Sequence, residues 1–289
     1  MLRQRIITAV LMLAIFLPAL FYAGPWAVAG LCLVLLTAGA WEWGRLNHLQ
    51  GPWAWAMGLI CLLACALSWW AGWLLLELRY VWSLAAVVWV LGGMFLLARG
   101  VPAWGLAPIW LRCLLGLLLL WAAWLAVAQA RLLSVNFLLS VLTLVWMADV
   151  AAYFAGKAWG GRWIARKLAA QISPGKSWEG AIGGVLGVLV LGLLWSEVEL
   201  RLQVPLAQRS VYGQLLAGHG LAVMVLAMIF LSAMSVVGDL LESLLKRSAG
   251  VKDSSGLLPG HGGVLDRVDA LLPVLPLAMM LAGFSRFSA

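Results

Sequence analysis

Long apolar runs separated by short polar segments constrain this chain more than any other feature. Nine runs, each about 17–24 residues long, can cross a hydrocarbon core of about 30 Å as helices that rise about 1.5 Å per residue. They are residues 6–23, 26–44, 53–70, 80–97, 113–130, 132–155, 178–196, 219–238 and 268–284. Only 10% of the residues are charged, against about 25% in a soluble domain. We therefore predict an all-α, polytopic integral membrane protein with about nine transmembrane helices.

The basic residues predict how these helices are oriented. An odd number of spans places the two termini on opposite sides of the membrane. With a cytoplasmic N-terminus, fourteen of the nineteen Lys and Arg residues lie inside and five outside, in agreement with the positive-inside rule. The prediction is a cytoplasmic N-terminus in a bacterial-type inner membrane, with the active site facing the cytoplasm.

The first span resembles a signal peptide in one respect. Arg3 and Arg5 precede it, and the small residues Ala23 and Gly24 follow it. Its apolar stretch of about 18 residues is longer than the roughly 7–15 residues of a typical signal-peptide core. The sequence therefore favours a retained transmembrane helix.

Polar residues divide the chain into two regions. Residues 1–130 contain few of them and are predicted to form an N-terminal scaffold of about five helices. Residues 131–289 are predicted to form a catalytic region, with active-site loops at 156–177 and 239–267 that hold nine of the nineteen basic residues. The net charge of +8 is spread over short loops, which favours anionic lipids or an anionic substrate as partners and argues against nucleic acid.

Asp149 is the first candidate site residue, because it lies inside an apolar run. A charged side chain within a transmembrane span is unfavourable unless it has a partner, and by default it indicates function. Lys157 or a residue of the segment 172–180 is the expected partner. A structural ion pair and an active-site role both stay open for Asp149.

The segment 172–180 reads ISPGKSWEG and contains two candidate helix caps. Ser173 can cap a helix that begins at Pro174, or Ser177 can cap the following span. The Gly-Lys-Ser triplet is not a Walker motif, because Ala170 stands where that motif needs glycine and no strand precedes it. A basic helix start of this kind suits a phosphate group, with Lys176 as a contact.

Carboxylates at helical spacing mark the second candidate loop. Asp266 and Asp269 are three residues apart, so both are expected on one helix face, where they repel unless a cation lies between them. Magnesium suits such a site, because it takes carboxylate oxygens, water and phosphate as ligands. Asp239 is the expected third donor. Glu242 and Lys246 are four residues apart and can simply pair with each other.

Glycines surround the one histidine of this loop. Gly260, Gly262 and Gly263 leave the backbone near His261 free to approach a ligand and to aim N–H groups at phosphate. His261 has no second His or Cys at ligand spacing, so zinc is not predicted. Three roles stay open for it: donation to a phosphate, proton transfer, and stabilisation of the turn.

Residues 243–269 read SLLKRSAGVKDSSGLLPGHGGVLDRVD, and this run resembles the diagnostic motif of the phosphatidate cytidylyltransferases, or CDP-diacylglycerol synthases, at every polar position. The pieces 149–160 and 173–180 are also similar to that family. The resemblance thus covers about residues 149–269, whereas the N-terminal half matches only as generic membrane helices.

The resemblance implies an enzyme that transfers a cytidylyl group from CTP to phosphatidic acid, with release of pyrophosphate and with magnesium required. A second metal ion is a further expectation from the family. The implied catalytic residues are Asp149, Lys252, Asp253, His261 and Arg267. The implied substrate-binding residues are Ser173, Lys176, Lys246, Arg247, Gly260, Gly262 and Gly263, and the implied metal ligands are Asp239, Asp266 and Asp269.

Two other classes of membrane protein compete with this interpretation. The CDP-alcohol phosphotransferases require an Asp-Gly pair, which this sequence lacks. A proton- or ion-coupled transporter would use Asp149 and Asp239 as relay residues, but the sequence has no internal repeat that would favour one. The expected partners are therefore CTP, phosphatidic acid and membrane lipids, and a homodimer is left open.

Overall fold

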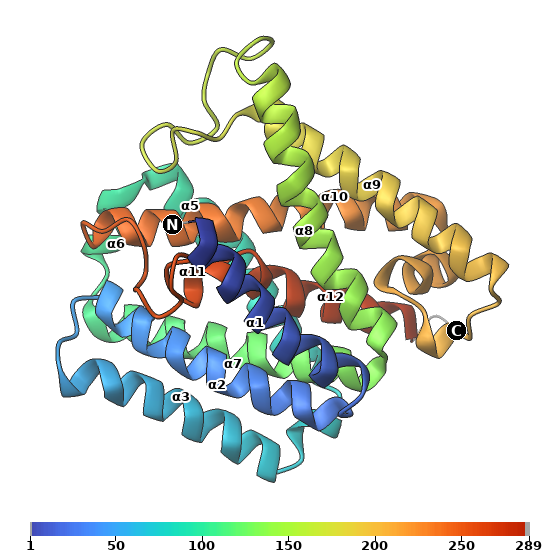
Figure 1. The fold of residues 1–289 in the computed structure, drawn as a ribbon, viewed down its shortest axis with the longest axis horizontal. Coiled ribbons are helices and arrows are strands. Elements are labelled where there is room, and N and C mark those ends of the chain that lie inside the picture. The colour runs from blue at the N-terminus through green and yellow to red at the C-terminus, as the bar shows by residue number, and fades with distance from the viewer. Residues whose placement is uncertain (1, 287–289) are drawn as a thin grey trace.

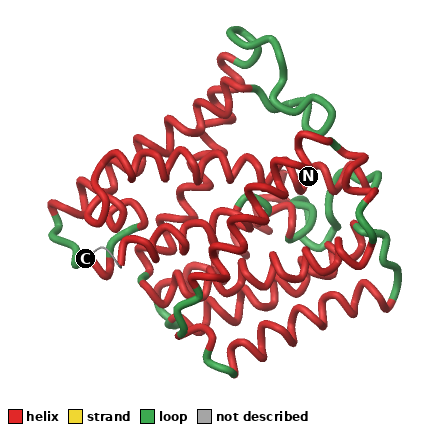
Figure 2. The backbone as a smooth tube through the Cα atoms, turned by 180° about the vertical axis from the view of Figure 1, so that it is seen from behind, coloured by secondary structure: helices red, strands yellow, loops and turns green. Residues whose placement is uncertain are grey.

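The computed structural model describes residues 2–286, which form a bundle of helices (Figure 1). Within this range no β-strand occurs, and two isolated bridges, Ala169 with Ser173 and Leu258 with Gly262, lie in loops. Figure 2 shows the same arrangement from behind, with loops only between the helices. The elements are α1 (Leu2–Phe21), α2 (Pro25–Leu46), α3 (Pro52–Trp70), η1 (Trp73–Leu75), α4 (Arg79–Val87), η2 (Val88–Gly92), α5 (Gly93–Arg99), α6 (Val101–Leu106), α7 (Ile109–Leu133), α8 (Val135–Trp159), α9 (Trp178–Arg201), η3 (Leu206–Gln208), α10 (Val211–Ser248), α11 (Leu265–Val268) and α12 (Leu271–Arg286).

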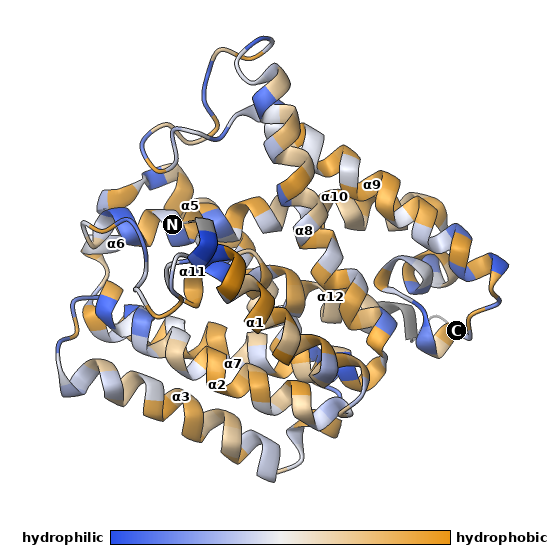
Figure 3. Ribbon diagram, viewed as in Figure 1, coloured by the Kyte–Doolittle hydropathy of each residue, from blue (hydrophilic) through white to orange (hydrophobic). Residues whose placement is uncertain are grey.

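Eight helices of the described chain are long and apolar enough to cross a membrane. They are α1, α2, α3, α7, α8, α9, α10 and the continuous helix Arg79–Arg99, which α4, η2 and α5 form together. Hydrophobic residues cover these helices, and hydrophilic residues gather at helix ends and in loops (Figure 3). The predicted all-α membrane class is confirmed. The ninth predicted span corresponds to α12, which has only 16 residues, so a ninth crossing stays a prediction.

Proline and serine residues set several helix starts. Pro25 and Pro52 occupy the first turns of α2 and α3, where a missing N–H leaves no hydrogen bond unmade. Ser134, Ser177 and Ser210 cap α8, α9 and α10 by accepting a hydrogen bond from a backbone N–H in the first turn. The predicted starts of these spans therefore fall within a few residues of the observed ones, except that of α10.

Helix α10 differs most from its predicted span, residues 219–238. It has 38 residues, and Gly220 interrupts it with φ 80°, which a glycine adopts without strain. Its C-terminal part continues to Ser248, so the first third of the predicted loop 239–267 is helical. Leu241, Leu244 and Leu245 are buried there, and packing of this apolar side holds the extra turns in the helix.

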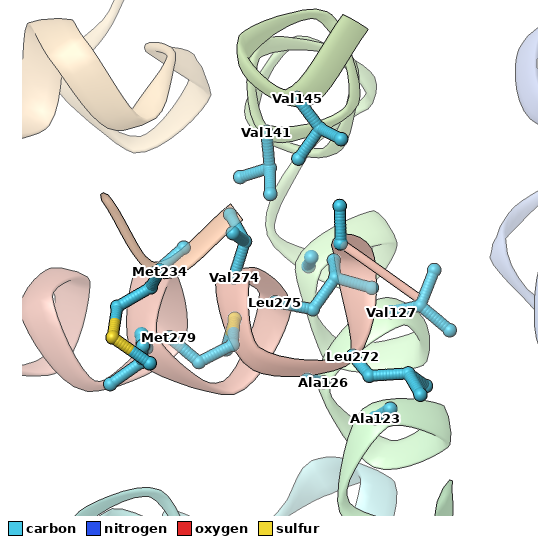
Figure 4. Close-up of a cluster of buried hydrophobic side chains, with 14 of the residues drawn as sticks. Ala123, Ala126, Val127, Val141, Val145, Met234, Leu272, Val274, Leu275 and Met279 are labelled. Atoms are coloured by element: carbon cyan, nitrogen blue, oxygen red, sulfur yellow. The ribbon is translucent and has the colours of Figure 1, made fainter. Parts of the chain in front are cut away.

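The core lies where α7, α8, α10 and α12 meet (Figure 4). Val141 and Val145 of α8 and Met234 of α10 pack around Leu275 of α12 and its neighbours. Ala126 on α7 is also fully buried in this cluster. Helix α12 is therefore enclosed by the bundle, which fixes the position of the short segment that precedes it.

Small residues allow α8 and α9 to approach closely. An added Cβ at Gly183 would lie 2.2 Å from the Cβ of Ala155, and one at Gly187 would lie 2.5 Å from that of Ala151. Helices in membranes associate through such small residues, because lipid tails offer no hydrophobic driving force between them. This contact brings Asp149 on α8 beside the start of α9.

Gly183→Ala is therefore expected to lower the thermal unfolding midpoint in detergent, because the two helix backbones must separate to admit a methyl group. Overpacking of this kind typically costs about 1–3 kcal/mol. Gly105→Ala is the matched control, since nothing lies within 4 Å of an added Cβ there. The double variant Gly183→Ala with Ala155→Gly should regain the wild-type midpoint, and its failure to do so would contradict the proposed contact.

Candidate active site

The two loops predicted to carry the chemistry lie at one end of the bundle. The loop after α8 and the C-terminal end of α10 are joined by an ion pair between Lys176 and Asp239. Arg247 adds a hydrogen bond from Nε to the carbonyl of Ile172, at 3.4 Å. Segments about 70 residues apart in the sequence thus form one site.

A cavity of about 460 Å³ lies between α8, α9 and α10 at this end. Asp149, Lys157, Lys176 and Asp239 line it, together with small residues of α8 and α9. Within the described chain Lys157 forms no ion pair with Asp149, so this predicted pairing is not observed, and Lys176 contacts Asp239 instead. Two carboxylates and two lysines therefore share one cavity.

The first loop is held by the start of α9. Ser177 caps this helix by accepting a hydrogen bond from the Gly180 N–H, at 3.1 Å. Of the two predicted caps, the one at Ser177 is confirmed, whereas Ser173 lies in a turn where no helix begins. One Glu179 oxygen accepts the N–H groups of Trp163 and Ile164, at 3.0 and 2.9 Å, and so fastens the preceding loop. This role of Glu179 was not predicted from the sequence.

The glycine loop, residues 254–265, folds around Asp266. One oxygen of Asp266 accepts from the N–H groups of Gly263 and Ser254, at 2.7 and 2.9 Å, and the other accepts from Lys246, at 2.6 Å. Burial opposes ionisation of this carboxyl, but Lys246 and these N–H groups outweigh it and lower its pKa to about 2. Gly262 has φ +82°, so glycine is required at this turn.

Lys246 bridges two buried carboxylates. It contacts Glu242 one turn earlier on α10 as well as Asp266. The predicted Glu242–Lys246 pair is thus confirmed. A role for Lys246 in phosphate binding stays a prediction.

Asp269 lies against α10 beside Asp239. An added Cβ at Gly238 would be 2.5 Å from the carbonyl oxygen of Asp269, so only a glycine lets the two segments approach this closely. Burial, followed by repulsion from Asp239 and Asp149, raises the pKa of Asp269 to about 7. Apart from its bond from the Ala270 N–H, at 2.8 Å, the Asp269 carboxylate has no hydrogen bond in the described structure.

The three predicted metal ligands are therefore in two environments. Asp239 and Asp269 lie near Asp149, whereas the oxygens of Asp266 are occupied by Lys246 and the glycine loop. Over residues 2–286 no group of three or more His, Cys, Asp or Glu side chains is arranged to hold a metal ion. The assignment of these residues to a metal stays a prediction.

The remaining predicted residues lie outside the lining of the cavity of about 460 Å³. Lys252, Asp253 and Arg267 among them are exposed. His261 is half-buried, and its Nδ1 atom is buried without a hydrogen bond among the described residues. The structure thus leaves the three roles considered for His261 open.

The N-terminal half contributes contacts that the sequence analysis missed. Arg5 and Thr8 of α1 donate hydrogen bonds to the carbonyl groups of Gly260 and Pro259, at 3.0 and 2.8 Å. Glu42 of α2 accepts hydrogen bonds from the other side of the same loop. The sequence does contain an indication of a role for Glu42, because this carboxylate lies in an apolar run, as Asp149 does.

Comparison with known proteins shows the family of this chain. The sequence matches the model of the cytidylyltransferase family over residues 3–285, and the chain belongs to that family. The phosphatidate cytidylyltransferase of Pseudomonas aeruginosa is 39% identical over 283 residues, which cover 96% of this chain and 95% of the relative. That of Haemophilus influenzae is 33% identical over 312 residues and 96% of each chain. That of Bacillus subtilis is 42% identical over 142 residues, which cover 49% of this chain and 45% of the relative.

Proposed function

We propose that this chain transfers the cytidylyl group of CTP to the phosphate of phosphatidic acid, which yields CDP-diacylglycerol and pyrophosphate. The observation that carries this proposal is the cavity where Asp149, Lys176 and Asp239 meet, in a chain whose relatives over nearly its full length are named phosphatidate cytidylyltransferase. Nothing in these names supports the transporter alternative.

Two adjoining cavities suit the two substrates. The first cavity suits the phosphates of the nucleotide, because Lys157 and Lys176 line it. A second cavity of about 880 Å³ shares Leu168, Val185 and Val236 with the first one and has a largely apolar lining. Arg99 and Arg166 also line it, which suits a lipid whose phosphate must reach the shared wall. We therefore place the nucleotide in the first cavity and phosphatidic acid in the second.

Magnesium fits the carboxylates at and beside the first cavity, which Asp149 and Asp239 line. Asp239 and Asp269 would hold it, with Asp149 beside them. Burial, followed by repulsion from Asp239 and Asp149, raises the pKa of Asp269, and a cation would relieve that repulsion. When bound, the ion would neutralise phosphate charge that develops during the transfer. Asp266, predicted as a ligand from the sequence, has its oxygens engaged elsewhere, and we give it the role of shaping the glycine loop. A second metal ion remains a further proposal.

The residues of the chain mainly position the reactants. A phosphate oxygen of phosphatidic acid forms a bond to the α-phosphorus of CTP while the bond from that phosphorus to pyrophosphate breaks. The attacking oxygen is already anionic, so alignment and charge neutralisation matter more than a strong base. Lys157 and Lys176 supply positive charge in the lining of the cavity, and we assign Arg247, Lys252 and Arg267, which do not line it, to further phosphate contacts.

The charge distribution supports a cytoplasmic location for this site. CTP is a soluble nucleotide, and the basic loops lie on the side that the positive-inside rule assigns to the cytoplasm. We therefore propose an inner-membrane enzyme with a cytoplasmic N-terminus and active site. A homodimer remains part of the proposal without support from the described contacts.

A labelling experiment tests the proposed function directly. Purified protein in detergent or nanodiscs receives labelled CTP, with phosphatidic acid and magnesium each present or omitted. Label should enter the organic phase only when all three are present. A folded, monodisperse protein that transfers no label to lipid would overturn the proposal.

A further inference from the structure

Glu42 is a buried carboxylate of the N-terminal half that contacts the glycine loop. It lies near the C-terminal end of α2 and has an exposed fraction of 0%. One oxygen accepts from the Ser255 hydroxyl and the Val264 N–H, at 2.5 and 2.9 Å. The other accepts from the Leu265 N–H, at 2.8 Å, and, at 3.1 Å, from the Ser254 hydroxyl, whose single proton it shares with Asp266. Four donors from both ends of the loop thus converge on one side chain.

Gly263, near the C-terminal end of the glycine loop, leaves space for the Glu42 carboxylate. An added Cβ at Gly263 would lie 2.3 Å from a Glu42 oxygen and 2.0 Å from the Ser254 hydroxyl. Only a glycine leaves room for the carboxylate between the two ends of the loop. The same Ser254 hydroxyl lies 2.8 Å from Asp266, so Glu42 is linked to the site through a single side chain.

We propose that Glu42 is a positioning residue, which holds residues 254–265 closed and thereby keeps Asp266 and Lys246 in place. It does not line either cavity and acts through the loop. The N-terminal half thus contributes a group that sets the geometry of the site in the C-terminal half.

The hydrogen bonds of Glu42 can be tested with a substitution that keeps the shape of the side chain. Glu42→Gln keeps the shape of the side chain but turns one oxygen into an NH₂ group. Each Glu42 oxygen accepts from two donors, so either orientation of the amide places its NH₂ group against two of them. A lost hydrogen bond to a charged group is typically worth about 1.5–3 kcal/mol, which is more than about tenfold in an opening equilibrium.

Glu199→Gln is the matched control. Glu199 is also buried, and it accepts from the N–H and the hydroxyl of Ser210 as well as from Asn136. Ser210 caps α10 at its N-terminal end, and Asn136 lies in the first turn of α8, so neither belongs to the glycine loop. A general loss of stability would therefore appear in both variants, and a loss of loop closure only in Glu42→Gln.

Hydrogen exchange of residues 254–265 is the primary measurement, because it needs no assumption about activity. Exchange there should be at least about tenfold faster in Glu42→Gln than in the wild type, and unchanged in Glu199→Gln. Equal exchange in wild type and Glu42→Gln, or equal acceleration in both variants, would overturn the inference. If Glu42→Gln does not fold, Ser255→Ala removes one of the four bonds, and a glycine loop that then exchanges at the wild-type rate would overturn it as well.

Turnover provides the second measurement and rests on the proposed function. Per folded molecule, kcat should fall at least about tenfold in Glu42→Gln and stay near the wild-type value in Glu199→Gln. Normal turnover in folded Glu42→Gln would overturn the inference. A wild-type protein without cytidylyl transfer, but with the exchange difference intact, would overturn the proposed function and leave the role of Glu42 standing.

Discussion

Asp269→Asn should lower kcat by at least about 10²–10³-fold while the protein remains folded. The reason is that Asn keeps an oxygen for the Ala270 N–H but removes the charge that we assign to magnesium binding. The stability of the folded protein should rise, because Asp269 is half-buried near Asp239 and Asp149 and forms no ion pair among the described residues, although Lys246 lies near it. In the presence of a chelator, the variant should unfold at or above the wild-type temperature.

Added magnesium separates a metal site from a purely structural carboxylate. It should raise the unfolding midpoint of the wild type through mass action and have little effect on Asp269→Asn. Glu197→Gln, an exposed carboxylate on α9, is the control and should respond to magnesium as the wild type does. Wild-type turnover by folded Asp269→Asn would contradict the assignment.

Lys246→Met should cause the largest loss of stability among single changes at the site. It leaves Glu242 and Asp266 without their shared cation, and the side chains of this trio are only 13%, 6% and 4% exposed. Removal of one partner from a buried ion pair typically costs about 3–5 kcal/mol. The measurement is the thermal unfolding midpoint in detergent.

An exposed pair of the same spacing provides the comparison. Glu197 and Arg201 are also four residues apart, but their side chains are 54% and 77% exposed. Arg201→Met should therefore lose only about 0.3–0.5 kcal/mol. The double variant Lys246→Met with Glu242→Gln should recover part of the stability. Equal losses for Lys246→Met and Arg201→Met would show that Lys246 has no structural role.

The helices could be predicted because the membrane imposes their length and apolar character locally. Pro52 and Ser177 set helix starts that can be found in the sequence alone. The break at Gly220 could not be predicted, because a glycine inside an apolar run is compatible with a continuous helix. The extension of α10 to Ser248 depends on tertiary packing of its leucines. It was not predicted, because the charged residues of that segment are typical of a loop outside the membrane.

Of the contacts at the candidate site, the sequence predicted those within one helix and not those between distant segments. Helical spacing correctly paired Glu242 with Lys246, because their contact lies within one helix. Helical spacing also predicted that Asp266 and Asp269 share one metal ion. In the structure Asp266 contacts Lys246 and the glycine loop, whereas Asp269 lies beside Asp239. Glu42 could not be paired at all, because its partners lie 212 to 223 residues further along the chain.

The long sequence separation of the Glu42 contacts has a consequence for biosynthesis. Helix α2 is made early, and its buried carboxylate has no donors until residues 254–265 have been synthesised and the last helices have packed. We expect an intermediate that stops before this point to leave this carboxylate without its hydrogen-bond donors, and therefore to open more easily and to be more susceptible to proteolysis. The hydrogen bonds between Glu42 and residues 254–265 thus couple the stability of the N-terminal helices to the folding of the glycine loop. The N-terminal helices reach their full stability only when this loop has folded.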